Sequence, residues 1–361
     1  MAAKIRVLVI DDSALIRRLL TDMLNSADDI EVVGTAPDPI VARDKIKSLE
    51  PDVLTLDIEM PRMDGITFLR NLMRLRPMPV VMVSTLTEQG ADVTLEALEL
   101  GAVDFVTKPK LDVNRVLAEY VDELTAKVRA AATARVKRLV RLDSPQPLLS
   151  SDAVVPRRPP QHLRTTDQII AIGASTGGTE AIKNVLLGMP RDAPGIVIAQ
   201  HIPPGFSAAF AERMNRVTQL DVKEAEDGDV VIPGHAFVAP GDRHLLLVRD
   251  GARYICRLSD GEPVNRHRPS VDVLFRSVLQ SAGVNAAAAL LTGMGADGAA
   301  GLLEMREAGL HTIAQDEQTS VVWGMPGEAA KRGAATEILP LDTIATHLLS
   351  AVWNQPRSVS G

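Results

Sequence analysis

Residues 168–179 carry the most informative pattern of this chain, and they read Gln168-Ile169-Ile170-Ala171-Ile172-Gly173-Ala174-Ser175-Thr176-Gly177-Gly178-Thr179. The apolar run at their start predicts a buried strand, and residues 180–187 predict a helix after them. Ser175 lies on the small-residue turn between the two, in the pattern Gly-x-Ser-x-Gly. Glycines on both sides allow a sharp turn that exposes the serine hydroxyl, an arrangement called the nucleophile elbow. The stretch therefore predicts a strand–turn–helix unit with a candidate nucleophile.

Strands and helices alternate along the rest of the C-terminal half. Predicted strands cover 195–200, 253–258, 286–291 and 312–316; predicted helices cover 206–217 and 299–308, with another beginning after Ser270 as N-cap; residues 235–248 predict a hairpin that the 253–258 strand could join. Such alternation is typical of a doubly wound, mainly parallel α/β domain.

Reactive side chains follow three of these predicted strands. Ser175, His201 and Asp297 each come after a strand's carboxyl end, so we expect them at one edge of a parallel sheet. A serine nucleophile, a histidine base and an aspartate that orients the histidine form a catalytic triad. The glycine-rich turn around Met294 is suited to an oxyanion hole, and we expect Thr176 to support His201 by a hydrogen bond. The order Ser…His…Asp argues against the α/β-hydrolase fold.

Each of these features has a simpler alternative. The turn after Ile172 could hold a phosphate at a helix N-terminus, although it lacks the Gly-x-Gly-x-x-Gly pattern. His201 alone would be a loop histidine, Asp297 a turn former, and the Thr176 hydroxyl a turn cap. Four other histidines could be ligands, but their spacing does not suggest a zinc site: His235, His244, His267 and His311. The combination of the three side chains at strand ends favours a hydrolase.

The N-terminal half shows the same alternation, with polar residues where the predicted strands end. These residues are Asp11, Asp12, Asp57, Ser84 and Lys108. Converging carboxylates repel one another, and their hard oxygen atoms suit Mg²⁺, beside which an aspartate can accept a phosphoryl group. Lys108 would offset charge or contact a phosphoryl oxygen. Any one of them could be a turn former, but together they predict a magnesium-dependent site in a second doubly wound domain.

Composition limits the kind of protein. The net charge of −7 argues against general binding to nucleic acid, and the lone Cys256 excludes an intrachain disulfide. No signal peptide precedes the first predicted strand, and no apolar run is long enough to span a membrane. We therefore expect a cytoplasmic protein with no membrane insertion.

A basic, proline-rich segment separates the two halves. Residues 127–166 hold nine Lys or Arg and two acids, with prolines in two clusters. This composition is typical of a solvated linker, and docking to an acidic partner is the alternative. The predicted domains are thus residues 1–124, a linker over 125–165, and residues 166–361.

The N-terminal half resembles the receiver domains of bacterial response regulators, which have a flavodoxin-like fold. The resemblance lies in the Asp11-Asp12 pair, the segment Asp57-x-x-Met60-Pro61-x-Met63-Asp64-Gly65, and Lys108-Pro109. It implies that a histidine kinase phosphorylates Asp57, and that Asp11 and Asp12 form the acidic pocket. It further implies that Asp12, Asp57 and the Glu59 carbonyl hold Mg²⁺, that Ser84 and Phe105 are switch residues, and that Lys108 contacts the phosphoryl group. Phe105 lacks the hydroxyl of the tyrosine often found there.

The C-terminal half resembles the chemotaxis protein-glutamate methylesterases. The matching segments are 172–178, Gln200-His201-Ile202-Pro203, Ala239-Pro240-Gly241-Asp242-x-His244, Arg268-Pro269-Ser270-Val271-Asp272 and 291–298. The resemblance implies hydrolysis of glutamyl methyl esters on methyl-accepting chemoreceptors, with release of methanol, and deamidation of receptor glutamines, without a cofactor in this half. It also implies that the unphosphorylated receiver blocks the catalytic cleft. A response regulator with a non-catalytic binding domain is the alternative from a different class.

Overall fold

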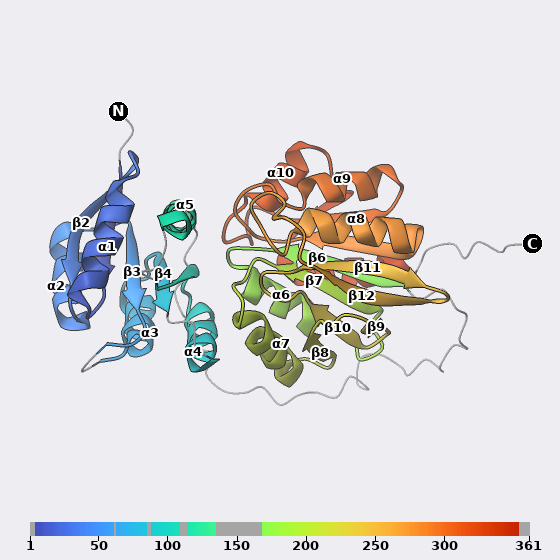
Figure 1. Ribbon diagram of the computed structural model, residues 1–361, viewed down its shortest axis with the longest axis horizontal. Helices are drawn as coiled ribbons and strands as arrows, with labels where there is room; N and C mark the ends of the chain where they lie inside the picture. The colour runs from blue at the N-terminus through green and yellow to red at the C-terminus, as the bar shows by residue number, and fades with distance from the viewer. Residues whose placement is uncertain (1–3, 61–62, 85–87, 109–113, 135–167, 354–361) are drawn as a thin grey trace, which may run out of the picture.

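The computed structural model describes residues 4–60, 63–84, 88–108, 114–134 and 168–353, which form two α/β domains lying side by side (Figure 1). A parallel sheet forms the centre of each domain, and a smaller antiparallel sheet is added to the second. Most of the predicted linker, residues 135–165, lies outside the described residues.

The sheet of the N-terminal domain, here called the receiver after the resemblance given above, is parallel throughout and has the order β2-β1-β3-β4-β5. Its strands are β1 (Ile5–Ile10), β2 (Ile30–Ala36), β3 (Val53–Asp57), β4 (Val80–Ser84) and β5 (Asp104–Thr107). β3 and β4 are buried along their whole length, which explains why most of their residues are apolar. This strand order is that of the flavodoxin-like fold, as the sequence predicts.

Helices cover both faces of the receiver sheet. They are α1 (Ala14–Asn25), α2 (Pro39–Leu49), α3 (Gly65–Leu75), α4 (Glu88–Glu99) and α5 (Asn114–Thr133). Ser13 caps α1 by accepting a hydrogen bond from the backbone N–H of Ile16 at 3.4 Å. The predicted boundary after residue 124 falls within α5, and Lys127 and Arg129 make ion pairs inside the receiver with Asp104 and Asp29. The receiver's helical part thus extends beyond that boundary.

The main sheet of the C-terminal domain, here called the catalytic domain after its resemblance to methylesterases, is also parallel and has the order β15-β14-β13-β6-β7-β10-β8. Its strands are β6 (Ile169–Ala174), β7 (Gly195–Gln200), β8 (Asp221–Glu224), β10 (His235–Val238), β13 (Ala286–Leu290), β14 (His311–Gln315) and β15 (Glu337–Leu339). The chain first builds outward from β6 through β7 and later returns to β13 on the opposite side of β6. Ligands of doubly wound sheets bind at such a switch in direction, beyond the carboxyl ends of the strands.

Two helical layers enclose this sheet. The helices are α6 (Gly178–Leu187), α7 (Phe206–Val217), α8 (Val271–Ala282), α9 (Ala299–Glu307), α10 (Met325–Lys331) and α11 (Leu341–Trp353). Figure 1 shows α8, α9 and α10 on one side of the sheet and α6 and α7 on the other. Separate apolar clusters fill the two sides, one around Phe275 and Met305, the other around Ile182 and Leu348.

The predicted hairpin over residues 235–248 is wrong. β10 pairs in parallel with β7 and β8 in the main sheet, whereas β11 (His244–Asp250) pairs antiparallel with β12 (Arg253–Ser259), which pairs with β9 (Val230–Val231). The turn between β10 and β11 exists, with Asp242 at φ 68° and its N–H donating to the carbonyl of Arg268 at 3.0 Å. That turn carries the chain into a different sheet instead of reversing it along β10.

Candidate active site and receiver site

The strand–turn–helix around Ser175 forms as predicted. β6 ends at Ala174, and Gly177 begins α6 as its N-cap with φ 74°, a conformation that favours glycine. The Ser175 N–H donates to the carbonyl of Thr292 at 3.0 Å, and the Gly178 N–H donates to the Ser175 carbonyl at 2.7 Å. These hydrogen bonds hold the serine on the turn at the switch point of the sheet.

His201 and Asp297 lie at the ends of the elements on either side of β6. His201 follows β7, and its backbone N–H donates to the carbonyl of Ala174 at 3.2 Å. Asp297 lies on the loop after β13. His201 Nε2 and Asp297 Oδ2 are 2.8 Å apart, so their side chains meet across the strand end that carries Ser175. The structure therefore brings the predicted triad residues to one edge of the sheet.

Asp297 is held as a buried carboxylate. Besides His201, it accepts hydrogen bonds from Ser270 Oγ at 2.8 Å, from the Val271 N–H at 2.7 Å, and from Asn265 Nδ2 at 2.7 Å. Burial would raise the pKa of Asp297, but these donors and His201 outweigh it and hold the pKa well below its usual range. Asp297 also faces the N-terminal end of α8, where the helix dipole favours negative charge.

The contact with Asp297 involves one of the two ring nitrogens of His201. An ionised carboxylate can only accept a hydrogen bond. His201 Nε2, which faces Asp297, therefore carries the ring proton in this contact. His201 Nδ1 is buried and has no hydrogen-bond partner within the described part of the chain. Nδ1 is thus the nitrogen available to take a proton from the serine.

His267 stacks on His201, a contact that sequence analysis missed. The two ring centroids are 3.7 Å apart and the ring planes differ by 13°. Burial and the nearby His201 lower the pKa of His267 to about 3, so its ring is neutral at physiological pH. Sequence analysis considered His267 only as a zinc ligand, and no local pattern would have placed it over a histidine 66 positions earlier.

The predicted oxyanion residues lie beside the serine. Within the described residues, the backbone N–H groups of Thr176 and Met294 donate to no protein acceptor. The Ser175 N–H, by contrast, donates to the carbonyl of Thr292. Gly293 packs against Ser175, because a Cβ added there would lie 2.8 Å from the Ser175 Cβ. Free N–H groups beside a nucleophile fit an oxyanion hole, which remains a prediction for these two residues.

The expected hydrogen bond from Thr176 to His201 is wrong. The buried Thr176 hydroxyl donates instead to Oδ2 of Asp104, on strand β5 of the receiver, at 2.5 Å. Hydroxyl–carboxylate hydrogen bonds of this length are charge-assisted and strong. The residue directly after the candidate nucleophile is therefore tied to the other domain.

Aromatic and ionic contacts continue this interface. The ring of Phe105, next to Asp104, lies 4.7 Å from the ring of Phe206 at the start of α7. Lys127 on α5 is 3.3 Å from Asp104 and lies over the Phe105 ring at 5.1 Å. Burial would lower the pKa of Lys127, but Asp104 and Glu123 outweigh it and raise the pKa to about 12. A predicted switch residue of the receiver is therefore packed against the catalytic domain.

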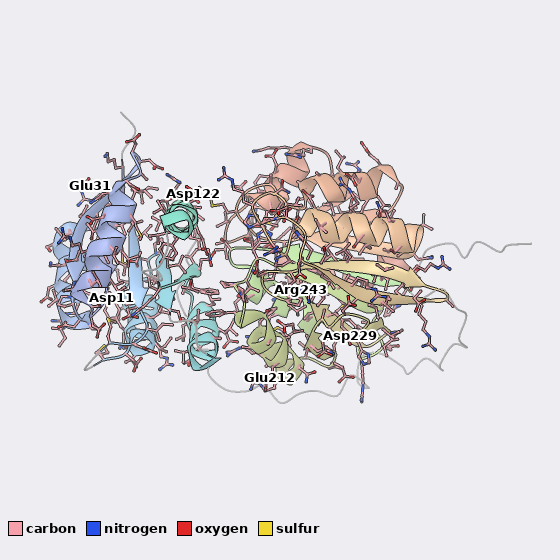
Figure 2. All side chains as sticks on the ribbon, viewed as in Figure 1. Asp11, Glu31, Asp122, Glu212, Asp229 and Arg243 are labelled. Carbon is pink, nitrogen blue, oxygen red and sulfur yellow. The ribbon has the colours of Figure 1, made fainter. Side chains whose placement is uncertain are left out.

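Glu99, the last residue of α4, joins the receiver to two helices of the catalytic domain. It pairs with Lys183 of α6 and with Arg213 of α7, whose Nε is 3.1 Å from Glu99 Oε1. Burial would raise the pKa of Glu99, but the two cations outweigh it and lower the pKa. A more exposed pair joins Asp122 on α5 (Figure 2) to Arg266 at 3.8 Å.

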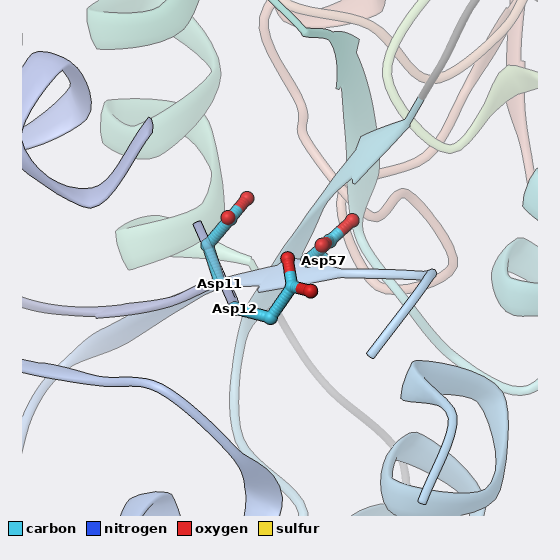
Figure 3. A group of neighbouring side chains, drawn as sticks. All are labelled: Asp11, Asp12 and Asp57. Carbon is cyan, nitrogen blue, oxygen red and sulfur yellow. The ribbon is translucent and has the colours of Figure 1, made fainter. Parts of the chain in front are cut away.

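The acidic residues of the receiver gather as predicted. Figure 3 shows Asp11 and Asp12 at the end of β1 beside Asp57 at the end of β3, and one oxygen of each lies within 4.8 Å of the others. Burial raises the pKa of Asp57 to about 6, although Lys108 Nζ lies 2.8 Å from its Oδ2 and opposes the shift. Asp11 Oδ2 is buried and accepts no hydrogen bond among the described residues. One lysine against three carboxylates leaves a hard-oxygen site that fits a divalent cation.

The other predicted receiver residues lie around this cluster. The Glu59 N–H donates to Asp57 Oδ1 at 3.3 Å. The hydroxyl of Ser84, at the end of β4, accepts a hydrogen bond from Thr94 of α4 at 2.8 Å. Ser84 thus connects the acidic edge of the sheet to α4, the helix that ends in Glu99.

Comparison with known proteins matches two parts of the chain to two different family models. A response regulator receiver domain model matches residues 7–120, and a CheB methylesterase model matches residues 170–348. A protein-glutamate methylesterase/protein-glutamine glutaminase of Xanthomonas oryzae is 58% identical over 346 residues, which cover 96% of this chain and 97% of that protein. This chain belongs to the CheB methylesterase family.

Other relatives of the family give the same result. A Geobacter metallireducens protein of the same name is 59% identical over 352 residues, covering 97% of each chain. The crystal structure of the Thermotoga maritima CheB methylesterase catalytic domain has a TM-score of 0.50 and 37% sequence identity, covering 51% of this chain and 97% of that domain. Within the described residues, no helix is both long and apolar enough to cross a membrane.

Proposed function

We propose that this CheB-family chain is a phosphorylation-regulated serine hydrolase that removes methyl esters from receptor glutamates and deamidates receptor glutamines. The observation that carries the proposal is the 2.8 Å contact between His201 and Asp297 across the strand end that holds Ser175. The named relatives, at 58–59% identity, are protein-glutamate methylesterases and protein-glutamine glutaminases.

The first half of the reaction forms an acyl-enzyme. Ser175 Oγ attacks the ester carbonyl carbon while His201 Nδ1 takes the hydroxyl proton, and Asp297 stabilises the resulting imidazolium through Nε2. The carbonyl oxygen becomes an oxyanion that the N–H groups of Thr176 and Met294 would stabilise. The C–O bond to the methoxy group then breaks, and His201 returns its proton to give methanol.

The second half regenerates the enzyme. Water attacks the acyl carbon while His201 Nδ1 accepts its proton, and the bond to Ser175 then breaks as His201 returns that proton to Ser175 Oγ. The glutamate leaves as a carboxylate, with its proton lost to solvent. A glutamine side chain follows the same path, with ammonia in place of methanol as the first product. These steps require a water-accessible Nδ1, whereas Nδ1 is buried in this structure.

The receiver would regulate the esterase activity through phosphorylation. A histidine kinase would transfer a phosphoryl group to Asp57, forming a P–O bond as the P–N bond of phosphohistidine breaks. Asp11, Asp12, Asp57 and the Glu59 carbonyl would hold Mg²⁺, which would offset the charge of the incoming phosphoryl group. Lys108 lies beside Asp57 and would contact the phosphoryl oxygen atoms.

The interface between the domains supports inhibition by the unphosphorylated receiver. Asp104 binds Thr176 beside Ser175, Phe105 packs on Phe206, and the switch hydroxyl of Ser84 is held by Thr94. Movement of Ser84 toward a phosphoryl group on Asp57 would disturb β5 and α4, which carry these contacts. Phosphorylation would thereby weaken the docking of the receiver.

The substrate and the place of action follow from this function. Methyl-accepting chemoreceptors are the proposed protein substrate, a histidine kinase is the proposed phosphodonor, and the lone, buried Cys256 fits work in the reducing cytoplasm. The esterase domain needs no cofactor in this scheme, since Ser175, His201 and Asp297 provide the nucleophile, base and orienting group.

Methanol release from methylated receptor tests the esterase directly. We expect wild type to release methanol and Ser175→Ala to fall to background, because the alanine has no nucleophilic oxygen. Folding of the variant is checked by its thermal melting curve. Methanol release by Ser175→Ala at the wild-type rate would contradict the assignment of the nucleophile.

A further inference from the structure

The segment that carries His267 is a tight two-residue turn. Val264 and His267 exchange two backbone hydrogen bonds, of 3.1 and 2.9 Å, and the residues between them, Asn265 and Arg266, have φ values of 54° and 68°. Positive φ at both central positions is the mark of a type I′ turn, normally occupied by glycine or asparagine. Arg266 bears this conformation against its steric preference. Such strain persists where surrounding contacts hold it, and it clusters at functional sites.

The turn places two side chains on the triad at the same time. Asn265 Nδ2 donates to Oδ1 of Asp297 and to Oδ2 of Asp272, each at 2.7 Å. His267 lies face to face with His201, with ring centroids 3.7 Å apart. The turn thus contacts both partners of the His201–Asp297 pair from outside the sheet.

We propose that His267 is a positioning residue, whose ring holds the plane of His201 so that Nε2 stays on Asp297 and Nδ1 stays open to Ser175. The inference rests on the proposed serine-hydrolase function, because it concerns the base of that reaction. His201 needs such support, since its only side-chain hydrogen bond within the described residues runs through Nε2, about which the ring could otherwise swing.

The chemistry of His267 fits this role better than that of a second base. Its pKa is lowered to about 3, so it is neutral while the triad works and does not repel the imidazolium that forms on His201. An aromatic face close to a cation is attractive, and it becomes most favourable when His201 carries the proton. This support depends on the planar ring of His267 and not on its nitrogen atoms.

That distinction gives the test its variants. His267→Ala removes the ring, and His267→Phe keeps a flat ring without nitrogen atoms. His235→Ala is the matched control. His235 is the first residue of β10, at the amino ends of the strands and so away from the triad, and its Nε2 is 3.8 Å from Asp221 Oδ2. All are made in the full chain, in the presence of a small-molecule phosphodonor.

The first readout is the labelling of Ser175 by a fluorophosphonate, with the maximal rate separated from the concentration for half-saturation. We expect His267→Ala to lower the maximal rate by about 10- to 100-fold with half-saturation within about twofold, because the base is misplaced. His267→Phe should stay within about threefold of wild type, and His235→Ala should match it. An unchanged rate in His267→Ala, or an equal loss in His267→Phe, would overturn the proposal.

The second readout does not depend on activity. Nitrogen-15 NMR of the imidazoles, with His201 assigned by comparison with His201→Gln, should show one ordered Nε2–H tautomer in wild type and in His267→Phe. His267→Ala should show an averaged signal. An unchanged His201 signal in His267→Ala overturns the positioning role. No labelling of wild-type Ser175 would overturn the hydrolase itself, and the NMR result would then still decide the role of His267.

Discussion

Asp297 shows how hydrogen-bond donors fix a buried carboxylate that in turn contacts a histidine. Its carboxylate collects hydrogen bonds from the Ser270 hydroxyl, the Val271 N–H and the Asn265 amide before it meets His201. These donors keep it ionised and hold its position, so the orientation of His201 follows from a group that is itself fixed. A carboxylate is needed, because every one of these partners donates and none accepts.

Exchange of that carboxylate for an amide is therefore a sharp test at the scale of one residue. We expect Asp297→Asn to lower kcat for methanol release by about 10²- to 10⁴-fold, because an amide favours the wrong tautomer of His201. Asp260→Asn is the control, since Asp260 is exposed and pairs with Arg243 at 2.7 Å. A kcat of Asp297→Asn within about fivefold of wild type would remove Asp297 from the triad.

At the scale of elements, α4 is one of the receiver elements that contact the catalytic domain. Thr94 of this helix donates to Ser84 at the proposed phosphorylation site, and Glu99 at its end pairs with Lys183 and Arg213. The side chain of Glu99 is 27% exposed, so its charge is only partly screened by solvent. One helix thus connects the acidic site with the interface.

Neutralising Glu99 should weaken the docking of the receiver on the catalytic domain. Glu99→Gln leaves Arg213 without its carboxylate partner among the described residues and leaves Lys183 with only its 3.6 Å contact to Glu180. Loss of a charged hydrogen bond costs about 1–3 kcal/mol, roughly 5- to 150-fold in the undocked population. We expect a higher rate of methanol release without phosphodonor. Glu96→Gln is the control, because Glu96 lies on the same helix and pairs with Arg70 inside the receiver at 2.9 Å. Equal basal rates in both variants would argue against inhibition through this contact.

Sequence analysis predicted where strands and helices lie better than it predicted which residues and strands they contact. The periodic runs around β6 and β7 located Ser175 and His201, because a residue after a parallel strand must lie at the sheet edge. The same local reasoning wrongly predicted a hairpin over residues 235–248. The sequence of a turn does not show which sheet the following strand joins. Thr176 was paired with the wrong residue, because Asp104 lies 72 positions away in another domain.

At the scale of the whole molecule, the two domains contact each other next to the turn that holds Ser175. β5 of the receiver carries Asp104 and Phe105 to the elbow that holds Ser175, and Val321 packs against the receiver core while lying next to Gly177. The base nitrogen of His201 is buried in this arrangement. These contacts are the ones that the proposed inhibition by the unphosphorylated receiver requires.

The ratio of methanol release with phosphodonor to that without it tests this dependence most directly. It would be measured on methylated receptor with Mg²⁺ and a small-molecule phosphodonor, for wild type and for Asp57→Ala. We expect a ratio well above one for wild type and a ratio of one for Asp57→Ala, because alanine accepts no phosphoryl group. Equal stimulation of the two proteins would contradict control through Asp57, and a ratio of one in wild type would contradict inhibition by the receiver.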